Sequence, residues 1–326
     1  MGSKAKPADI TPTTGADFLA KLREFPATRR PDIEKLPFLE AIAAWDGDRI
    51  APKTVWKTFG HLKRVVAYAA TMKLIPSDPL AVVKNPKPRA TERVKDRTAY
   101  DPDEIKRLFS RPMFKGFGGK ADWGYRDESG DQVVKDAKYW LPVFSLWHGC
   151  RLDEIASSRA SELKDRDGIP YLDWTRRKLK TPESSRELPI HPVMKALGWV
   201  EYVADVRQRG DFLFPDLAHD IDDPEKAARA FSRWFGHWRT KNGFTDSALD
   251  FHSLRHTFKR ACRDAGLSEE VHDLLTGHKG AGGVGRSYGQ GADLKTLAGA
   301  LAKVSYPTFP LATYKPPPKW GGPVVW

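Results

Sequence analysis

The stretch that decides the fold and chemistry of this chain is His252-Ser253-Leu254-Arg255-His256, followed by Gly277-His278 and then Tyr288. A phosphoryl transition state carries charge on its non-bridging oxygens, and arginine offers those oxygens a planar pair of donors at any working pH. Arg255 is therefore the candidate phosphate clamp. Together with the imidazoles and the phenol, it makes a set of groups suited to cutting a phosphodiester without a metal.

The histidines and Tyr288 complete this set. Histidine titrates near neutral pH, so His252 and His278 can transfer protons or donate hydrogen bonds. Tyrosine has a pKa of about 10 in water and needs a base or cationic neighbours to act as a nucleophile. We expect Tyr288 to attack with the help of such neighbours.

The spacing of His252 and His256 also fits a pair of zinc ligands on one helix. The sequence between them lacks the glutamate that a metalloprotease places there, so no metal site is predicted. A histidine on a helix is often a structural residue, and for His256 both a supporting and a structural role stay open.

Two further motifs lie upstream. Residues 149–155 read Gly-Cys-Arg-Leu-Asp-Glu-Ile, and Lys180-Thr181 precedes Arg-Glu-Leu-Pro-Ile at 186–190. With them, the chain resembles the tyrosine recombinases of the phage integrase family. Their core reads G-x-R-x-x-E-I, K-T…R-x-x-P-[LI], H-x-L-R-H-T, L-x-G-H or L-G-H, and then Y about ten residues on. The resemblance covers roughly residues 13–307 and is strongest from Arg151 to Tyr288.

The resemblance implies site-specific DNA recombination, as integration or excision, through a covalent 3′-phosphotyrosine and without metal, cofactor or ATP. Its implied partners are double-stranded DNA, three further copies of the chain and, in some systems, accessory DNA-bending proteins. Arginines and His278 would hold the phosphate, Tyr288 would attack, Lys180 would protonate the 5′ oxygen, and His252 would assist. The residues so implied are Arg151, Lys180, His252, Arg255, His278 and Tyr288, with Glu154 and His256 in support.

The composition agrees with a DNA partner. The chain has 326 residues, enough for two domains, and a net charge of +12. Basicity favours a polyanion, although a membrane surface or a ribosome would also attract it. No run of eighteen apolar residues and no apolar signal core occur, so we expect a protein of the cytoplasm and nucleoid. Cys150 and Cys262 are expected to be small buried residues.

The expected fold is mainly α-helical with a small antiparallel β-sheet. The resemblance implies a two-domain architecture, in which a helical core-binding domain precedes a mixed α/β catalytic domain. The expected divisions are a flexible N-terminus (1–12), a helical DNA-binding domain (13–83), a basic linker (84–98), a catalytic domain (99–307) and a proline-rich, disordered tail (308–326).

Three helices are predicted in the first domain. Thr13 or Thr14 caps the first, a second covers 33–42, and Pro52 opens a third whose core stripe is Trp56, Phe59, Leu62 and Val66. Residues 1–98 hold 19 Lys and Arg against 11 Asp and Glu. This excess favours a DNA-facing role over a merely solvated face. The candidate DNA-binding residues are Lys53, Lys57, Arg64, Arg89 and Arg93.

The second domain is predicted in the same way. Asp101 caps a helix, 111–137 form a surface loop, 139–147 form a buried helix that ends near Arg151, and Lys180 lies between two strands. Further helices are expected over 192–241 with a break at 212–215, over 250–266, from Ser268 to Gly277 and over 292–304. In the family the last helix packs into a neighbouring protomer, and packing within the chain is the alternative.

Three other functions compete with recombination. A type IB topoisomerase shares the residues and the chemistry but relaxes supercoils as a monomer. A non-catalytic DNA-binding module would be basic without needing all six polar residues. A metal-dependent nuclease would need carboxylate clusters, which are not evident, and EDTA would stop it.

Overall fold

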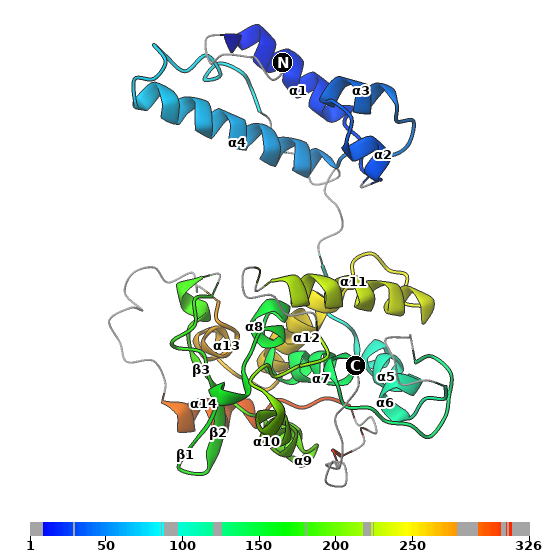
Figure 1. Cartoon of the computed structure of the whole chain (residues 1–326). Coiled ribbons are helices and arrows are strands. Elements are labelled where there is room, and N and C mark those ends of the chain that lie inside the picture. Colours follow the sequence, from blue (N-terminus) through cyan, green and yellow to red (C-terminus); the bar gives the residue numbers. More distant parts are fainter. Residues whose placement is uncertain are drawn as a thin grey trace. The chain divides into compact units, whose positions relative to one another are not determined.

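The computed structural model describes residues 9–28, 30–85, 87, 97–119, 126–179, 181–217, 223, 225–278, 293–307, 311 and 313–314. The chain divides into two compact units, residues 1–96 and 97–326 (Figure 1). The predicted fold class, mainly α-helical with a small antiparallel sheet, is confirmed.

The N-terminal unit is helical. Its core joins the first helix to the last, with Phe59 fully buried between them. Pro52 opens the last helix as predicted, and Phe59 and Val66 lie on its buried side together with Val55. The helices are α1 (Pro12–Arg23), α2 (Pro31–Glu34), α3 (Phe38–Ala43) and α4 (Pro52–Thr71).

Three details of this unit were predicted wrongly. The cap of α1 is Thr11, whose side chain accepts a hydrogen bond from the amide of Thr14 at 3.1 Å. The helix expected over 33–42 is instead divided into α2 and α3, because Pro37 lacks an amide hydrogen and disfavours helical geometry in the residue before it. Trp56 and Leu62 are half-buried rather than central to the core.

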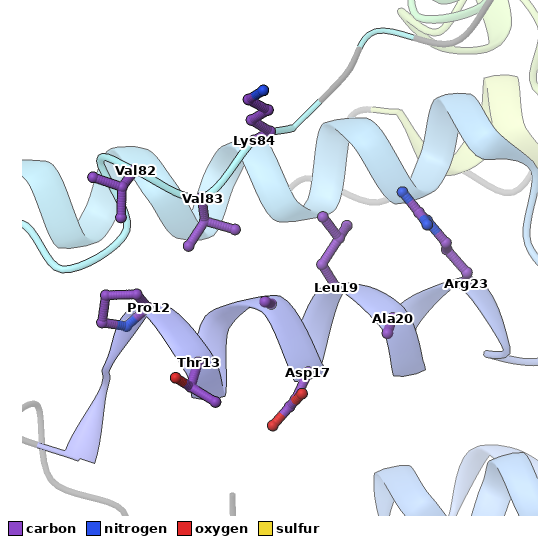
Figure 2. A pocket seen from close by; sticks show the side chains of 10 residues that line it. Pro12, Thr13, Asp17, Leu19, Ala20, Arg23, Val82, Val83 and Lys84 are labelled. Carbon is purple, nitrogen blue, oxygen red and sulfur yellow. The ribbon is translucent and has the colours of Figure 1, made fainter.

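An open groove of about 550 Å³ runs along α1 (Figure 2). Pro12, Thr13 and Asp17 line it from the helix, and Val82 and Lys84 line it from the segment that follows α4. It has both charged and apolar walls.

The C-terminal unit is organised around a buried helix, α7, which packs along α12 (Figure 1). Every residue of α7 is buried, and it contains Pro142. The helices of this unit are α5 (Pro102–Phe109), α6 (Pro112–Lys115), α7 (Ala137–His148), α8 (Leu152–Ala156), α9 (Pro192–Ala196), α10 (Trp199–Arg209), α11 (Lys226–Lys241), α12 (Phe251–Asp264), α13 (Glu269–Thr276) and α14 (Leu294–Leu301), with short 3-10 turns η3 (Ala160–Glu162) and η4 (Pro182–Ser184).

The sheet has three antiparallel strands in the order β1 (Leu163–Arg166), β2 (Ile169–Asp173) and β3 (Glu187–Pro189). Leu172 pairs with Leu188, and both are fully buried. Helix α14 lies against β3 and buries Leu294, Leu297 and Leu301 within its own unit.

Sequence patterns located most elements of this unit. Asp101 and Glu104 form the expected capping box of α5, and Ser268 caps α13. The helical region 192–241 is broken near 212–215 as predicted, and between α9 and α10 as well. Trp238, on α11, is fully buried in the core of this unit.

Two predictions for this unit are wrong. The stretch 111–137 is not simply a surface loop, because Met113, Phe114 and Phe117 in it are fully buried and Phe117 exchanges backbone hydrogen bonds with Gln132. Part of the tail is also packed, since the hydroxyl of Tyr314 donates to Asp205 at 2.8 Å.

Among the described residues, no helix is long and apolar enough to cross a membrane.

Candidate active site

Arg151 lies at a sharp turn between two helices. Gly149, with φ of +61°, ends α7, and Arg151 is the N-cap of α8. Nη1 of Arg151 donates to Glu154 Oε1 at 2.9 Å, to Ser184 Oγ at 2.8 Å and to the carbonyl of Gly277 at 3.1 Å. These contacts fix one edge of the guanidinium and leave its side chain 21% exposed.

Glu154 is the buried counter-ion of this turn. Its Oε1 accepts from the guanidinium of Arg151, and its Oε2 accepts from Arg186 Nη2 at 3.0 Å and from the backbone amide of Arg151 at 2.9 Å. The side chain of Glu154 is 1% exposed. Burial acts to raise the pKa of Glu154, but Arg186 and then Arg151 outweigh it, and the pKa falls to about 2. Glu154 is therefore ionised at neutral pH and holds the guanidinium of Arg151, which lies one helical turn before it.

Arg255 lies on α12 and contacts the same turn, at Gly149. Its Nη1 donates to the carbonyls of Gly149 and Thr276, both at 2.6 Å. Its Nη2 is buried and has no hydrogen-bond partner among the described residues. Burial, and then the charge of Arg151, lower the pKa of Arg255 to about 10, so it stays protonated at neutral pH.

The end of α13 brings the two arginines together. Arg255 binds the carbonyl of Thr276 and Arg151 that of Gly277, so two guanidiniums from distant parts of the chain meet at consecutive peptide groups. These carbonyls are at the helix C-terminus, where the partial charge is negative and cations are stabilised. His278 follows directly and its side chain is half-exposed.

His252 and His256 lie one turn apart on α12, with ring centroids 5.1 Å apart. Burial, and then His256 and Arg255, lower the pKa of His252 to about 4. His252 is therefore neutral at pH 7, so one of its ring nitrogens carries no proton and can accept a hydrogen bond. Among the described residues, no three His, Cys, Asp or Glu side chains are grouped as metal ligands would be.

Residues 138–293 match the model of the phage integrase family. The predicted resemblance is thereby confirmed for the part of the chain that carries the two arginines, and the enzyme class that accompanies it is that of the tyrosine site-specific recombinases. No curated protein matches the sequence.

Several solved structures resemble the chain. The integrase from mycobacterium phage Brujita has 16% identity and a TM-score of 0.41, with 92% of this chain and 87% of that chain covered. A lambda integrase dimer bound to a COC′ core site has 15% identity and a TM-score of 0.46, with 84% and 63% covered. The Tn1549 transposon integrase, in complex with transposon right end DNA, has 13% identity and a TM-score of 0.45, with 93% and 84% covered.

The integrase domain thus places Arg151, Glu154, Arg255 and His278 around the end of α13, with His252 and His256 on the helix that carries Arg255. The predicted general acid Lys180 and nucleophile Tyr288 lie outside the described residues.

The candidate DNA-binding residues belong to the other unit or to the linker. Lys53, Lys57 and Arg64 are exposed on α4, away from its buried side. Arg89 and Arg93 lie outside the described residues.

Arg186 is the residue of the integrase domain whose importance the sequence did not reveal. It begins the Arg-Glu-Leu-Pro-Ile motif, and its buried guanidinium joins Glu154 to the carbonyls of Ser184, at 2.8 Å, and Leu275, at 3.0 Å. A Cβ at Gly277 would lie 2.5 Å from Arg186 Nη1, so no side chain fits there. The motif itself was the available signal, because an arginine just before a buried strand needs a counter-ion.

Proposed function

We propose that this protein is a site-specific DNA recombinase, which breaks and rejoins strands through a covalent 3′-phosphotyrosine on Tyr288. The observation that carries the proposal is the pair of guanidiniums held at consecutive carbonyls, Thr276 and Gly277, beside His278. Two such groups side by side match the non-bridging oxygens of one phosphodiester.

In the proposed reaction, the phenolic oxygen of Tyr288 forms a bond to phosphorus while the bond from phosphorus to the 5′ oxygen breaks. Arg151, Arg255 and His278 stabilise the charge on the non-bridging oxygens. Lys180 gives a proton to the departing 5′ oxygen, and His252 assists the loss of the phenolic proton from Tyr288. A 5′ hydroxyl from another strand then reverses the step, and because the phosphotyrosine retains the bond energy, no ATP is consumed.

The proposed substrate is double-stranded DNA, and the proposed assembly is a tetramer on it, with accessory DNA-bending proteins as further partners. The exposed Lys53, Lys57 and Arg64 support DNA binding by the N-terminal unit. The proposal includes α14 as a contact between protomers. Because α14 buries its leucines in its own unit, the side left for such a contact carries Lys295 and Thr296.

The test is to incubate the protein in EDTA with DNA from the genomic flanks of its own gene and to sequence the ends that become covalently attached to protein. The wild type should give adducts at defined positions, and Tyr288→Phe should bind the same DNA without forming any. Tyr68→Phe, at an exposed position of α4, is the matched control.

An adduct formed by the Tyr288→Phe protein would show that the nucleophile is another residue, and a requirement for divalent metal would point to a nuclease. Relaxation of any supercoiled plasmid by a monomer, without strand exchange, would favour the topoisomerase alternative.

A further inference from the structure

Asp273, on the last turn of α13, lies next to the proposed catalytic His278. Its Oδ1 is 3.7 Å from His278 Nδ1, 3.4 Å from Lys259 Nζ and 3.0 Å from His272 Nδ1. The carboxylate is largely buried, whereas the imidazole of His278 is half-exposed. One carboxylate therefore lies among three basic groups, one of which belongs to the site.

The backbone brings Asp273 and His278 to the same side of the helix end. Gly277, with φ of +62°, closes α13, and the amides of Gly277 and His278 both donate to the carbonyl of Asp273, the latter at 3.0 Å. This closure is common at helix C-termini. It fixes the backbone of His278 relative to the carboxylate of Asp273, so the distance between the two side chains is set by the rotation of the imidazole.

Lys259 keeps the carboxylate in place from α12. It lies one turn after Arg255 and donates to Asp273 Oδ1 at 3.4 Å, with both side chains mostly buried. The pair joins the helix that carries Arg255 and His252 to the helix that delivers His278. His272 contributes less, because neither of its ring nitrogens makes a hydrogen bond with a described residue despite the close approach to Asp273.

Asp273 is the charge that favours a protonated His278. Burial lowers the pKa of His278, as do Lys259 and, from the other side of the site, Arg255 and Arg151, whereas Asp273 raises it. A histidine that donates to a phosphate from one nitrogen is best oriented when its other nitrogen donates to a carboxylate.

On the basis of the proposed function, we propose that Asp273 is a positioning residue for His278. When the phosphate is bound, the carboxylate of Asp273 accepts a hydrogen bond from His278 Nδ1, and Nε2 donates to a non-bridging oxygen. A small rotation of the imidazole closes the distance of 3.7 Å. Lys259 holds the carboxylate and limits how strongly it attracts the imidazole.

Substitution of Asp273 and substitution of Lys259 should move the pH dependence of cleavage in opposite directions. Asp273→Asn removes the charge that favours protonation, so the pKa of His278 falls and cleavage is lost at a lower pH than in the wild type. Lys259→Met removes an opposing charge, so the pKa of His278 rises and cleavage persists to a higher pH. A purely structural role would give no such opposition.

The measurement uses the full chain with histidine labelled for NMR, and His278→Gln assigns the His278 signal. Its titration is compared with single-turnover adduct formation on a DNA fragment that carries the mapped site. Asp273→Asn should slow adduct formation at neutral pH by roughly tenfold or more, with DNA affinity unchanged. Asp273→Glu should restore part of the rate. Asp127→Asn, which breaks an Asp–Lys pair with Lys241 elsewhere in the unit, is the matched control.

The inference is overturned if Asp273→Asn cleaves at the wild-type rate, or if both substitutions move the His278 titration in the same direction. Should Asp273→Asn unfold, Lys259→Met alone decides, since an unchanged His278 titration in that variant would contradict the proposal. Failure of the wild type to form any adduct would instead refute the proposed function, and the NMR titration would still show whether Asp273 controls the protonation of His278.

Discussion

In the C-terminal unit the Glu154 side chain is 1% exposed between two arginines, whereas in the N-terminal unit Tyr68 and Leu74 are 64% and 75% exposed. The C-terminal unit buries charged side chains and pairs them, whereas the N-terminal unit leaves large apolar side chains and several lysines on its surface. In the proposed reaction, the arginines that hold the scissile phosphate are thus positioned by contacts within the C-terminal unit. Substitutions there should change the chemical step, and those on α4 should change binding.

The largest expected effect is that of Arg255→Lys. Lysine keeps the charge but loses the planar fork that binds the carbonyls of Gly149 and Thr276 and offers Nη2 to a ligand. We expect single-turnover adduct formation to fall by about 10²–10³-fold, while affinity for the DNA site changes little. Arg166→Lys, which alters an exposed fork on Glu187 at the sheet surface, is the control. A rate within threefold of the wild type would mean that the chemical step does not depend on the fork.

A smaller effect is expected on the stability of the C-terminal unit when the pH is lowered. The pKa of Glu154 is depressed from about 4.5 to about 2 in the folded protein, so its stabilising contribution is complete above pH 4.5 and is lost as the pH falls towards 2. That contribution is roughly 3 kcal/mol in the free energy of unfolding. Hydrogen exchange of peptides from 137–156, at a series of urea concentrations, would follow the C-terminal unit alone.

Glu154→Gln should remove this part of the acid dependence and destabilise the unit at neutral pH, because it leaves Arg186 buried without a counter-ion. Glu187→Gln, which breaks a partly exposed pair with Arg166, should cost less than about 1 kcal/mol. Equal decreases in the free energy of unfolding of Glu154→Gln and Glu187→Gln would contradict the contrast between buried and exposed charge.

The smallest effect is expected on α4. Lys57→Ala should weaken DNA binding a few-fold and reduce the slope of log affinity against log salt by about 1, since one phosphate contact is lost. The rate of adduct formation on saturating DNA should not change. Lys21→Ala, an exposed lysine already paired with Glu24, is the control. A change in the rate of adduct formation on saturating DNA in Lys57→Ala would contradict the assignment of DNA binding to α4 and of the chemical step to the C-terminal unit.

The polar motifs indicated the candidate site residues because their residue types carry the chemistry wherever they occur in the fold. Arg151, Glu154 and Arg255 were identified without any knowledge of their contacts, and local signals such as the box at Asp101 and Glu104 located helix starts. These features depend on a few neighbouring residues or on chemistry alone.

The remaining features depend on contacts between distant residues. Nothing near Arg186 in the sequence indicates that its counter-ion is Glu154, or that it also binds the carbonyl of Leu275. Phe117 follows a glycine in a charged stretch, so its burial could not be read from periodicity. Tyr314 lies in a proline-rich tail, and its packing depends on a hydrogen bond to Asp205 that no local pattern predicts.

The way in which Arg255 is held has a final consequence. Neutral peptide carbonyls at two helix ends, rather than an acidic side chain, bind its Nη1. Among the described residues, no carboxylate forms an ion pair with this guanidinium. In the proposed reaction, an arriving phosphate would therefore have none to displace, and its oxygens would meet a cation that has already lost most of its water. On the proposed function, Arg255 itself would then need little rearrangement when the strand docks.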